Sequence, residues 1–300
     1  MNQIHIPVLL KEVVQFLDPK PNQNFVDCTL GGGGHAEAIL EKTSPQGKFL
    51  GIDWNKASLM VAKKRLASFE NRSIFVCDNF VNLTKIVREN NFIPISGILL
   101  DLGLSSYLLE KSKKGFSFRK DEYLDMRYSQ LPATNLKLTA ADIINTYSEK
   151  ELIKIFKKYG EERYAKAIVR EIVQVRKKEK IDTTFKLVNV VLSAVPASYK
   201  RRRIHPATKV FQALRIAVNN ELENLRQVLP QAQELLESGG RLALISYQSL
   251  EDRIVKNFFK EKSKEDNLRI ITKKPIVSTQ EEIQKNPRSR SAKMRVAERT

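Results

Sequence analysis

Four consecutive glycines, Gly31 to Gly34, join a run typical of a buried β-strand, 25–30, to a helical stretch that continues to about residue 40. Glycine lets a strand turn sharply into a helix and lets the backbone approach a ligand closely. Short β-rich runs recur further along, alternating with helical stretches, at 48–53, 73–78 and 97–101. Because alternating strands and helices are typical of βαβ units, the sequence predicts an α/β fold with a parallel sheet covered on both faces.

The alternation stops after Asp101 and resumes only after residue 205. Between these points there is no convincing strand, whereas Ser148 and Glu151 form a capping-box pattern that precedes an apolar helical stripe. Strand and helix patterns then return, with a long helix over 207–229, a strand at 241–246, a helix over 249–262 and short runs at 268–271 and 293–297. We therefore predict a discontinuous Rossmann-like domain, 1–106 and 206–300, with an all-helical domain inserted at 107–205.

The charge of the chain is large and unevenly distributed. Lys and Arg number 52 against 34 Asp and Glu, which gives a net charge of +18. Residues 1–106 hold 11 basic and 10 acidic side chains, so the remaining 41 basic and 24 acidic side chains lie in 107–300. A polyanionic partner, either nucleic acid or an anionic membrane surface, is therefore the first expectation. The alternative is a lysine-rich composition that spreads solvated charge, which the nearly neutral first third disfavours.

Other features narrow the setting. No apolar run approaches the roughly 18 residues that a membrane helix needs. Because the sequence also shows neither an anchor nor a basic amphipathic terminus, a membrane partner is not expected. The two cysteines, Cys28 and Cys77, both fall in β-rich runs, which indicates a reducing, cytoplasmic location rather than a disulfide framework. The three histidines and two cysteines show no metal-ligand spacing, and we predict no metal site.

The glycine run and the strand ends suggest a nucleotide-like cofactor. Gly31, Gly33 and Ala36 satisfy the dinucleotide pattern G-x-G-x-x-A, so a nicotinamide cofactor is one alternative. Asp53, 22 residues after Gly31, can accept ribose hydroxyls in either case. Asp78 and Phe80 offer a polar contact and an aromatic wall for adenine. Asp27 places negative charge beside the loop, which favours the cationic S-adenosylmethionine over a pyrophosphate.

A second strand end carries Asp101, followed by a Gly/Ser turn that includes Ser105. Chemistry in open α/β sheets lies at the carboxyl ends of the strands. We therefore predict Asp101 and Ser105 as catalytic residues that accept a substrate N–H or hydroxyl, with a helix cap as the structural alternative for either residue.

Several strings, in chain order, resemble the MraW (RsmH) family of bacterial methyltransferases, which modifies N4 of a cytidine in the decoding centre of 16S ribosomal RNA. They lie at His5 to Val13, Asp27 to His35, Asp101 to Ser106, Gly115 to Phe118, Leu124 to Arg127, His205 to Ile216, Ser249 to Arg253 and Asn286 to Ala292. The resemblance implies a Rossmann-like methyltransferase fold with a helical insert and S-adenosylmethionine as cofactor.

The resemblance also implies site residues. The family's cofactor contacts fall on Gly33, Gly34, His35, Asp53, Phe80, Asp101 and the position of Leu108. Three departures stand out: Leu108 replaces a glutamine, Tyr247-Gln248 replaces Phe-His, and Glu122-Tyr123 replaces Gly-Pro. For His35, a backbone contact at the start of a helix is expected rather than a role as a base.

Arginines outside the first third are the expected contacts to RNA. They are Arg127, Arg201, Arg202, Arg203, Arg253, Arg288 and Arg290. The expected partner is 16S ribosomal RNA or the assembling small ribosomal subunit, and a dimer is one alternative for the oligomeric state. Two other functions stay open: a methyltransferase acting on another nucleic acid, and a cofactor-binding ribosome-assembly factor with little or no activity.

Overall fold

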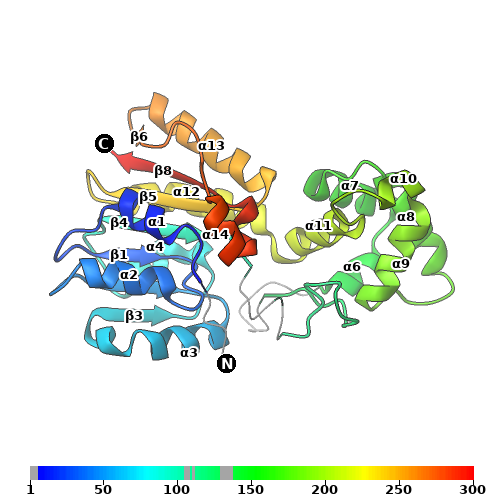
Figure 1. Ribbon diagram of the computed structural model, residues 1–300, viewed down its shortest axis with the longest axis horizontal. Coiled ribbons are helices and arrows are strands. Elements are labelled where there is room, and N and C mark those ends of the chain that lie inside the picture. Colours follow the sequence, from blue (N-terminus) through cyan, green and yellow to red (C-terminus); the bar gives the residue numbers. More distant parts are fainter. Residues whose placement is uncertain (1–5, 105–108, 110–111, 129–137) are drawn as a thin grey trace. The chain divides into compact units, whose positions relative to one another are not determined.

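The computed structural model describes residues 6–104, 109, 112–128 and 138–300. The chain divides into two compact units: an α/β unit made of residues 1–103 and 222–300, and a helical unit made of residues 104–221 (Figure 1). The first boundary lies next to the one predicted at 106/107. The second lies at 221/222 rather than at 205/206, so 206–221 falls in the helical unit.

The α/β unit holds all the named strands of the described chain. Its strands are β1 (Phe25–Asp27), β2 (Phe49–Ile52), β3 (Ser73–Val76), β4 (Gly97–Asp101), β5 (Arg241–Ser246), β6 (Leu268–Ile270), β7 (Ile276–Val277) and β8 (Lys293–Arg299). Its helices are α1 (Leu10–Leu17), α2 (Gly34–Lys42), α3 (Lys56–Arg65), α4 (Leu83–Glu89), α12 (Glu221–Leu235), α13 (Ser249–Lys264) and α14 (Gln280–Lys285), with short 3₁₀ turns η1 (Ala67–Arg72), η2 (Phe80–Asn82) and η3 (Pro287–Ser291).

The sheet has the strand order β3-β2-β1-β4-β5-β8-β6, with β7 also paired to β8. The first five of these strands run parallel, as the sequence predicts, whereas β8 runs antiparallel to β5, β6 and β7. The parallel order places β1 between β2 and β4. The carboxyl ends of these three strands therefore lie next to one another, which is where a site is expected in such a sheet.

Two apolar layers hold the sheet. Alternate residues of β4 show the division, because Ile98 and Leu100 pack with α4, α12 and α13, whereas Leu99 packs with α1, α2 and α3. Helices therefore cover both faces (Figure 1), and the strands are buried on each side. Parallel strands that are covered on both faces consist of nearly continuous apolar residues, and these strands could therefore be predicted from the sequence.

The helical unit contains α6 (Ala140–Thr146), α7 (Glu149–Gly160), α8 (Ala165–Val175), α9 (Thr184–Ala194), α10 (Ala197–Lys200) and α11 (Ala207–Asn219). The predicted capping box at Ser148 and Glu151 is confirmed at the start of α7. The single helix predicted over 207–229 is wrong, because Asn220 adopts a left-handed φ of 51° and separates α11 from α12. A Cβ on Gly160 would lie 2.6 Å from the Lys209 carbonyl oxygen, so this glycine lets α11 approach α7 closely.

Candidate functional site

Three carboxylates lie at the carboxyl ends of neighbouring parallel strands. Asp27 ends β1, Asp53 directly follows β2, and Asp101 ends β4. Because β1 pairs with both β2 and β4, the strand order brings together residues that are far apart in the sequence. All three are among the sequence-predicted site residues, and the fold gathers them at one edge of the sheet.

The glycine loop between β1 and α2 is braced by Asp53. Gly31 and Gly33 have φ values of 53° and 77°, in the left-handed region that favours glycine. The Gly31 N–H donates to Asp53 Oδ2 at 2.8 Å, and the Asn55 N–H donates to Asp53 Oδ1 at 2.7 Å. Each carboxylate oxygen keeps a second lone pair, with which Asp53 can accept a ribose hydroxyl.

Thr29 connects the Asp27 carboxylate to the backbone of Asp101. Its hydroxyl donates to Asp27 Oδ1 at 3.2 Å and accepts the Asp101 N–H at 2.6 Å. The Thr29 N–H also donates to Asp27 Oδ1, at 2.9 Å, and the Gly103 N–H donates to Asp101 Oδ1 at 3.1 Å. These hydrogen bonds fix the ends of β1 and β4 to each other, and Asp27 is buried at 1% exposure.

The electrostatics of this edge favour a cation. Burial raises the pKa of Asp27 to about 7, with repulsion from Asp101 adding to the effect and hydrogen bonds from Thr29 opposing it. Burial likewise raises the pKa of Asp53 to about 6, against the hydrogen bonds from Asn55 and Gly31. The ionised form of a buried acid is stabilised by a neighbouring positive charge and destabilised by a negative one. The site therefore fits the sulfonium and ammonium groups of S-adenosylmethionine better than a pyrophosphate.

An aromatic surface lies beyond the second and third strands. The rings of Trp54 and Phe80 are stacked, with centroids 6.4 Å apart and an interplanar angle of 23°. Asp78 accepts hydrogen bonds from the Asn79 N–H at 2.6 Å and the Asn82 side-chain amide at 3.0 Å, which fixes the turn into η2. A flat heterocycle such as adenine suits a surface of this kind, with the aromatic rings against its face.

His35 is held by a partner within the chain. Its imidazole Nε2 lies 2.9 Å from the Val8 carbonyl oxygen and donates to it, and the ring is buried. The side chain therefore fixes the segment before α1. The group that His35 could offer a cofactor is its backbone N–H in the first turn of α2. Gly34 stands directly before it, where a Cβ would lie 2.8 Å from Arg65 Nη1.

The arginines predicted to contact RNA differ in their exposure and in their partners. Arg127 forms a two-pronged ion pair with Asp125, at 2.8 and 3.0 Å, within the helical unit. Arg201, Arg202 and Arg203 follow α10 and are exposed, and within the described chain none of the three pairs with a carboxylate. The Arg202 guanidinium lies 5.1 Å from the centre of the Tyr199 ring.

The other three arginines belong to the α/β unit. Arg253 is exposed on α13, Arg290 is exposed in η3, and Arg288 is half-buried beside it. Two predicted site residues, Ser105 and Leu108, lie outside the described residues.

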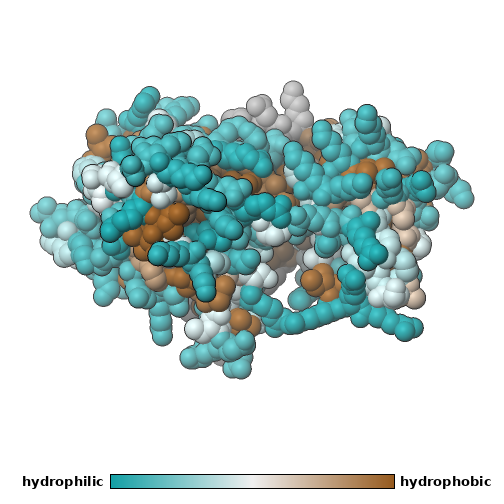
Figure 2. Space-filling view, turned by 90° about the horizontal axis from the view of Figure 1, so that it is seen from above, coloured by the Kyte–Doolittle hydropathy of each residue, from teal (hydrophilic) through white to brown (hydrophobic). Residues whose placement is uncertain are grey.

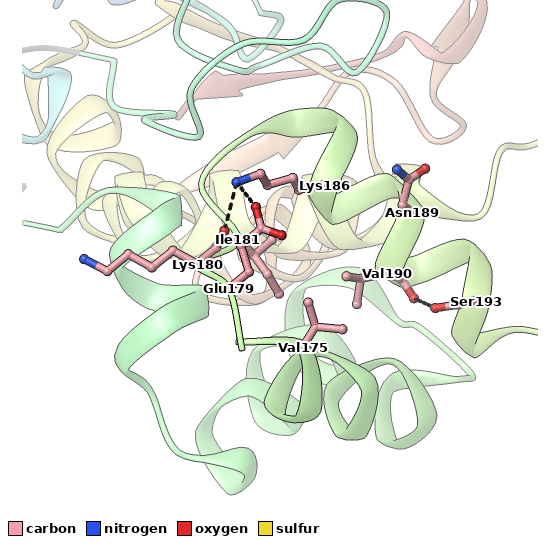
Figure 3. A pocket seen from close by; sticks show the side chains of 8 residues that line it. All are labelled: Val175, Glu179, Lys180, Ile181, Lys186, Asn189, Val190 and Ser193. Carbon is pink, nitrogen blue, oxygen red and sulfur yellow. Dashed lines mark hydrogen bonds and ion pairs between the residues drawn. The ribbon is translucent and has the colours of Figure 1, made fainter. Parts of the chain in front are cut away.

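A cavity of about 340 Å³ lies in the helical unit, and none of the predicted site residues lines it. Figure 3 shows the ammonium group of Lys186 directed at Glu179 and at the Lys180 carbonyl oxygen, at 2.6 and 3.3 Å. Asp182 lies 3.1 Å from the same ammonium. Two carboxylates therefore neutralise the charge of Lys186.

The described residues hold neither a candidate metal site nor a candidate membrane-spanning helix. No group of three His, Cys, Asp or Glu side chains in the described part of the chain is arranged to hold a metal ion. Among those same residues, no helix combines the length and apolar character needed to cross a bilayer. Figure 2 shows hydrophilic side chains over most of the visible face.

Sequence reasoning missed three residues at this edge. Thr29 links Asp27 to Asp101, Trp54 stacks on Phe80, and the Tyr247 ring and Asp101 Oδ1 both lie beside Gly103. Thr29 and Trp54 each lie within two residues of a predicted carboxylate, so their position in the sequence could have indicated that they belong to the site. Tyr247 is far from Asp101 in sequence, and only its place after β5 could have suggested the contact.

Comparison with known proteins gives full-length matches. The model of the MraW methylase family matches residues 2–300. A protein of Dehalococcoides mccartyi named "Ribosomal RNA small subunit methyltransferase H" is 47% identical over 98% of this chain and 86% of its own length. The protein of the same name from Carboxydothermus hydrogenoformans is 46% identical over 98% and 97%. Among solved structures, a putative rRNA-methylase from Clostridium thermocellum shares 14% identity and a TM-score of 0.44, covering 99% of this chain and 100% of that one.

Proposed function

The chain belongs to the MraW methylase family and takes S-adenosylmethionine as its cofactor, and from this premise we propose that it methylates N4 of a cytidine in the decoding centre of 16S ribosomal RNA. Full-length relatives named ribosomal RNA small subunit methyltransferase H support an RNA of the small ribosomal subunit as the substrate. The proposed partner is that RNA, alone or in the assembling subunit, in the cytoplasm.

One observation carries the proposal: Asp101 stands at the end of β4, fixed by Thr29 and Gly103, beside the acids suited to a cationic cofactor. When bound, S-adenosylmethionine supplies a methyl group on a sulfonium. Asp27 would balance its positive charge, Asp53 would accept ribose hydroxyls, Phe80 and Trp54 would contact the adenine, and Gly33, Gly34 and His35 would offer backbone N–H groups.

The exocyclic amine of cytosine is a poor nucleophile because its lone pair is delocalised into the ring. Positioning therefore supplies much of the rate, and an acceptor for one N–H localises the lone pair. We assign this role to the Asp101 carboxylate. Once N4 carries the methyl group it is positively charged, and Asp101 would take one of its protons, directly or through water. No covalent bond to the cytosine ring is required.

The substrate-holding surface is assigned to the helical unit. Residues 104–221 contain 25 Lys and Arg against 13 Asp and Glu, a net charge of +12 in a chain of +18. The exposed Arg201, Arg202 and Arg203 are the proposed phosphate contacts there, since phosphate contacts supply most of the affinity for nucleic acid. Arg127 is left out of this set because Asp125 neutralises its charge. Arg253, Arg288 and Arg290 are proposed contacts from the α/β unit.

The experiment that tests the proposal uses small ribosomal subunits from a bacterial strain that lacks this methylation. The protein is incubated with tritiated S-adenosylmethionine and the subunits, and the RNA is digested to nucleosides. Label in N4-methylcytidine, lost or reduced by about 100-fold or more in Asp101→Asn, is the expected result. Label in another nucleoside would overturn the assigned site, and cofactor binding without label would favour a ribosome-assembly factor.

A further inference from the structure

We propose that Tyr247 is a positioning residue: its hydroxyl donates a hydrogen bond to the Asp101 carboxylate and holds that carboxylate in the orientation in which it accepts the substrate N–H. This inference rests on the proposed function, because it assigns a task to Asp101. It adds a second side chain, from a different strand, to the reacting edge of the sheet.

The strand register brings the two residues together. Asp101 pairs with Ile245 across β4 and β5, and Tyr247 stands two residues further along the same strand direction. Tyr247 therefore leaves the sheet at the same edge as Asp101. The Tyr247 hydroxyl is carried on Cζ, which lies beside Gly103 as Asp101 Oδ1 does, and in this proposal it is the donor because a carboxylate accepts.

Gly103 leaves the space in which this contact forms. A Cβ on Gly103 would lie 2.9 Å from Tyr247 Cε2, 3.0 Å from Tyr247 Cζ and 3.1 Å from Asp101 Oδ1. The ring and the carboxylate thus converge on one side of the same glycine. The N–H of Gly103 donates to Asp101 Oδ1 at 3.1 Å, and the Tyr247 hydroxyl would be the second donor from within the α/β unit.

Tyr247 is itself fixed without help from Asp101. Its backbone N–H donates to Glu251 Oε2 at 3.0 Å, and Glu251 is only 4% exposed. Its ring packs on the apolar layer that contains Leu99, Ile245 and Met294. Burial, with the negative charge of Asp101, raises the pKa of Tyr247 far above its ordinary value, so the hydroxyl remains a donor at any pH of interest.

The consequence for the reaction concerns rate rather than affinity. A carboxylate on a single bond can rotate, and only some orientations direct a lone pair at the amine. Two donors on Asp101 restrict that rotation before substrate arrives, which lowers the cost of reaching the transition state. Because the Tyr247 hydroxyl acts through Asp101 and is assigned no contact with the RNA or the cofactor, its removal should act on kcat.

Tyr247→Phe tests the inference because it removes the hydroxyl and keeps the ring. We expect kcat to fall about 10-fold, the effect of one lost hydrogen bond, with KM for RNA and for S-adenosylmethionine within about twofold of the parent. In a background of Asp101→Asn, the same change should have no further effect on the rate. Independent, multiplying effects would mean that Tyr247 acts without Asp101, and an unchanged kcat would mean that the hydroxyl has no role; either result overturns the inference.

Tyr199→Phe is the matched control, because the Tyr199 hydroxyl also donates to a carboxylate, that of Glu162, at 2.8 Å in the helical unit. It should lower the Tm and leave kcat unchanged. A second measurement separates this inference from the proposed function. In protein labelled with carbon-13 at the aspartate carboxyl, the Asp101 resonance, identified by its loss in Asp101→Asn, should move in Tyr247→Phe. If it does not move, the hydrogen bond is absent, whatever substrate the enzyme methylates.

Discussion

The Asp53 carboxylate accepts a hydrogen bond from the Gly31 N–H at 2.8 Å, although the two residues are 22 positions apart in the chain. The residue that follows β2 therefore sets the conformation of the loop that follows β1. This connection gives Asp53 two tasks, because the same side chain braces the loop and presents lone pairs to a ribose. A substitution at Asp53 should consequently affect both stability and cofactor affinity.

Asp53→Asn should cost about 1–3 kcal/mol in the free energy of unfolding, since an amide has one acceptor oxygen and must leave the Gly31 or Asn55 N–H unpaired. Cofactor affinity should fall at least about 10-fold. Chemical denaturation and calorimetric titration measure the two effects. Asp266→Asn, at an exposed position, is the control and should change neither. A stable variant with unaltered affinity would remove Asp53 from the site.

The free energy of unfolding should decrease as pH rises from about 4 to 7. Burial raises the folded-state pKa of Asp27 to about 7, so in this window the folded protein holds a proton that the unfolded chain has lost. Stability from this group is full at low pH and lost above the folded pKa, a difference of about 1–4 kcal/mol. Asp27→Asn should make the dependence less steep without removing it, because burial also raises the pKa of Asp53, to about 6, and that group acts in the same window. Denaturation of parent and variant at several pH values measures the two slopes. An equally steep slope in the variant would assign the titration to another group.

The ionisation of Asp27 should also make cofactor binding depend on pH. A cationic ligand favours the ionised form of Asp27, so the affinity for S-adenosylmethionine should increase as pH rises through 7, by at most about 10-fold per pH unit. Calorimetry in buffers of different ionisation enthalpy would show proton release below pH 7. The neutral product S-adenosylhomocysteine, which lacks the sulfonium charge, is the comparison and should show a weaker dependence. Equal dependence for both ligands contradicts a charge interaction with the sulfonium.

Replacing Arg201, Arg202 and Arg203 with alanine should weaken RNA binding and lower the slope of log affinity against log salt by about 2 to 3, because each lost phosphate contact removes close to one released counterion. Filter binding across a salt series measures both. Lys150, Lys154 and Lys157 on α7, also exposed and in the helical unit, provide a charge-matched control triple. Equal losses from the two triples would indicate general attraction rather than a defined interface.

Asn219→Ala should destabilise the protein by about 2–4 kcal/mol. This fully buried amide donates to the Met126 and Arg215 carbonyl oxygens at 2.8 and 2.9 Å and accepts the Tyr128 N–H at 2.9 Å. Its loss leaves buried backbone groups unpaired. Thermal and chemical unfolding measure the loss, with Asn189→Ala, at an exposed position, as the control. A loss below about 0.5 kcal/mol would show that water replaces the amide.

The sequence by itself determined the features that depend on neighbouring residues. The glycine run between strand and helix, the acids at the strand ends and the capping box of α7 are all written in short segments, because strand burial, left-handed turns and helix caps are decided within a few residues. The break in the strand–helix alternation likewise predicted a helical insert.

The tertiary structure alone decided which distant groups meet. Four features were not predicted from the sequence. They are the left-handed Asn220 that ends α11, the ion pair that neutralises Arg127, the hydrogen bond from the His35 imidazole to the Val8 carbonyl, and the approach of Tyr247 to Asp101. Such contacts depend on strand order and packing, which no local pattern encodes. The candidate site was therefore predicted as a set of strand ends, whereas the hydrogen bonds that hold each carboxylate in place came only from the fold.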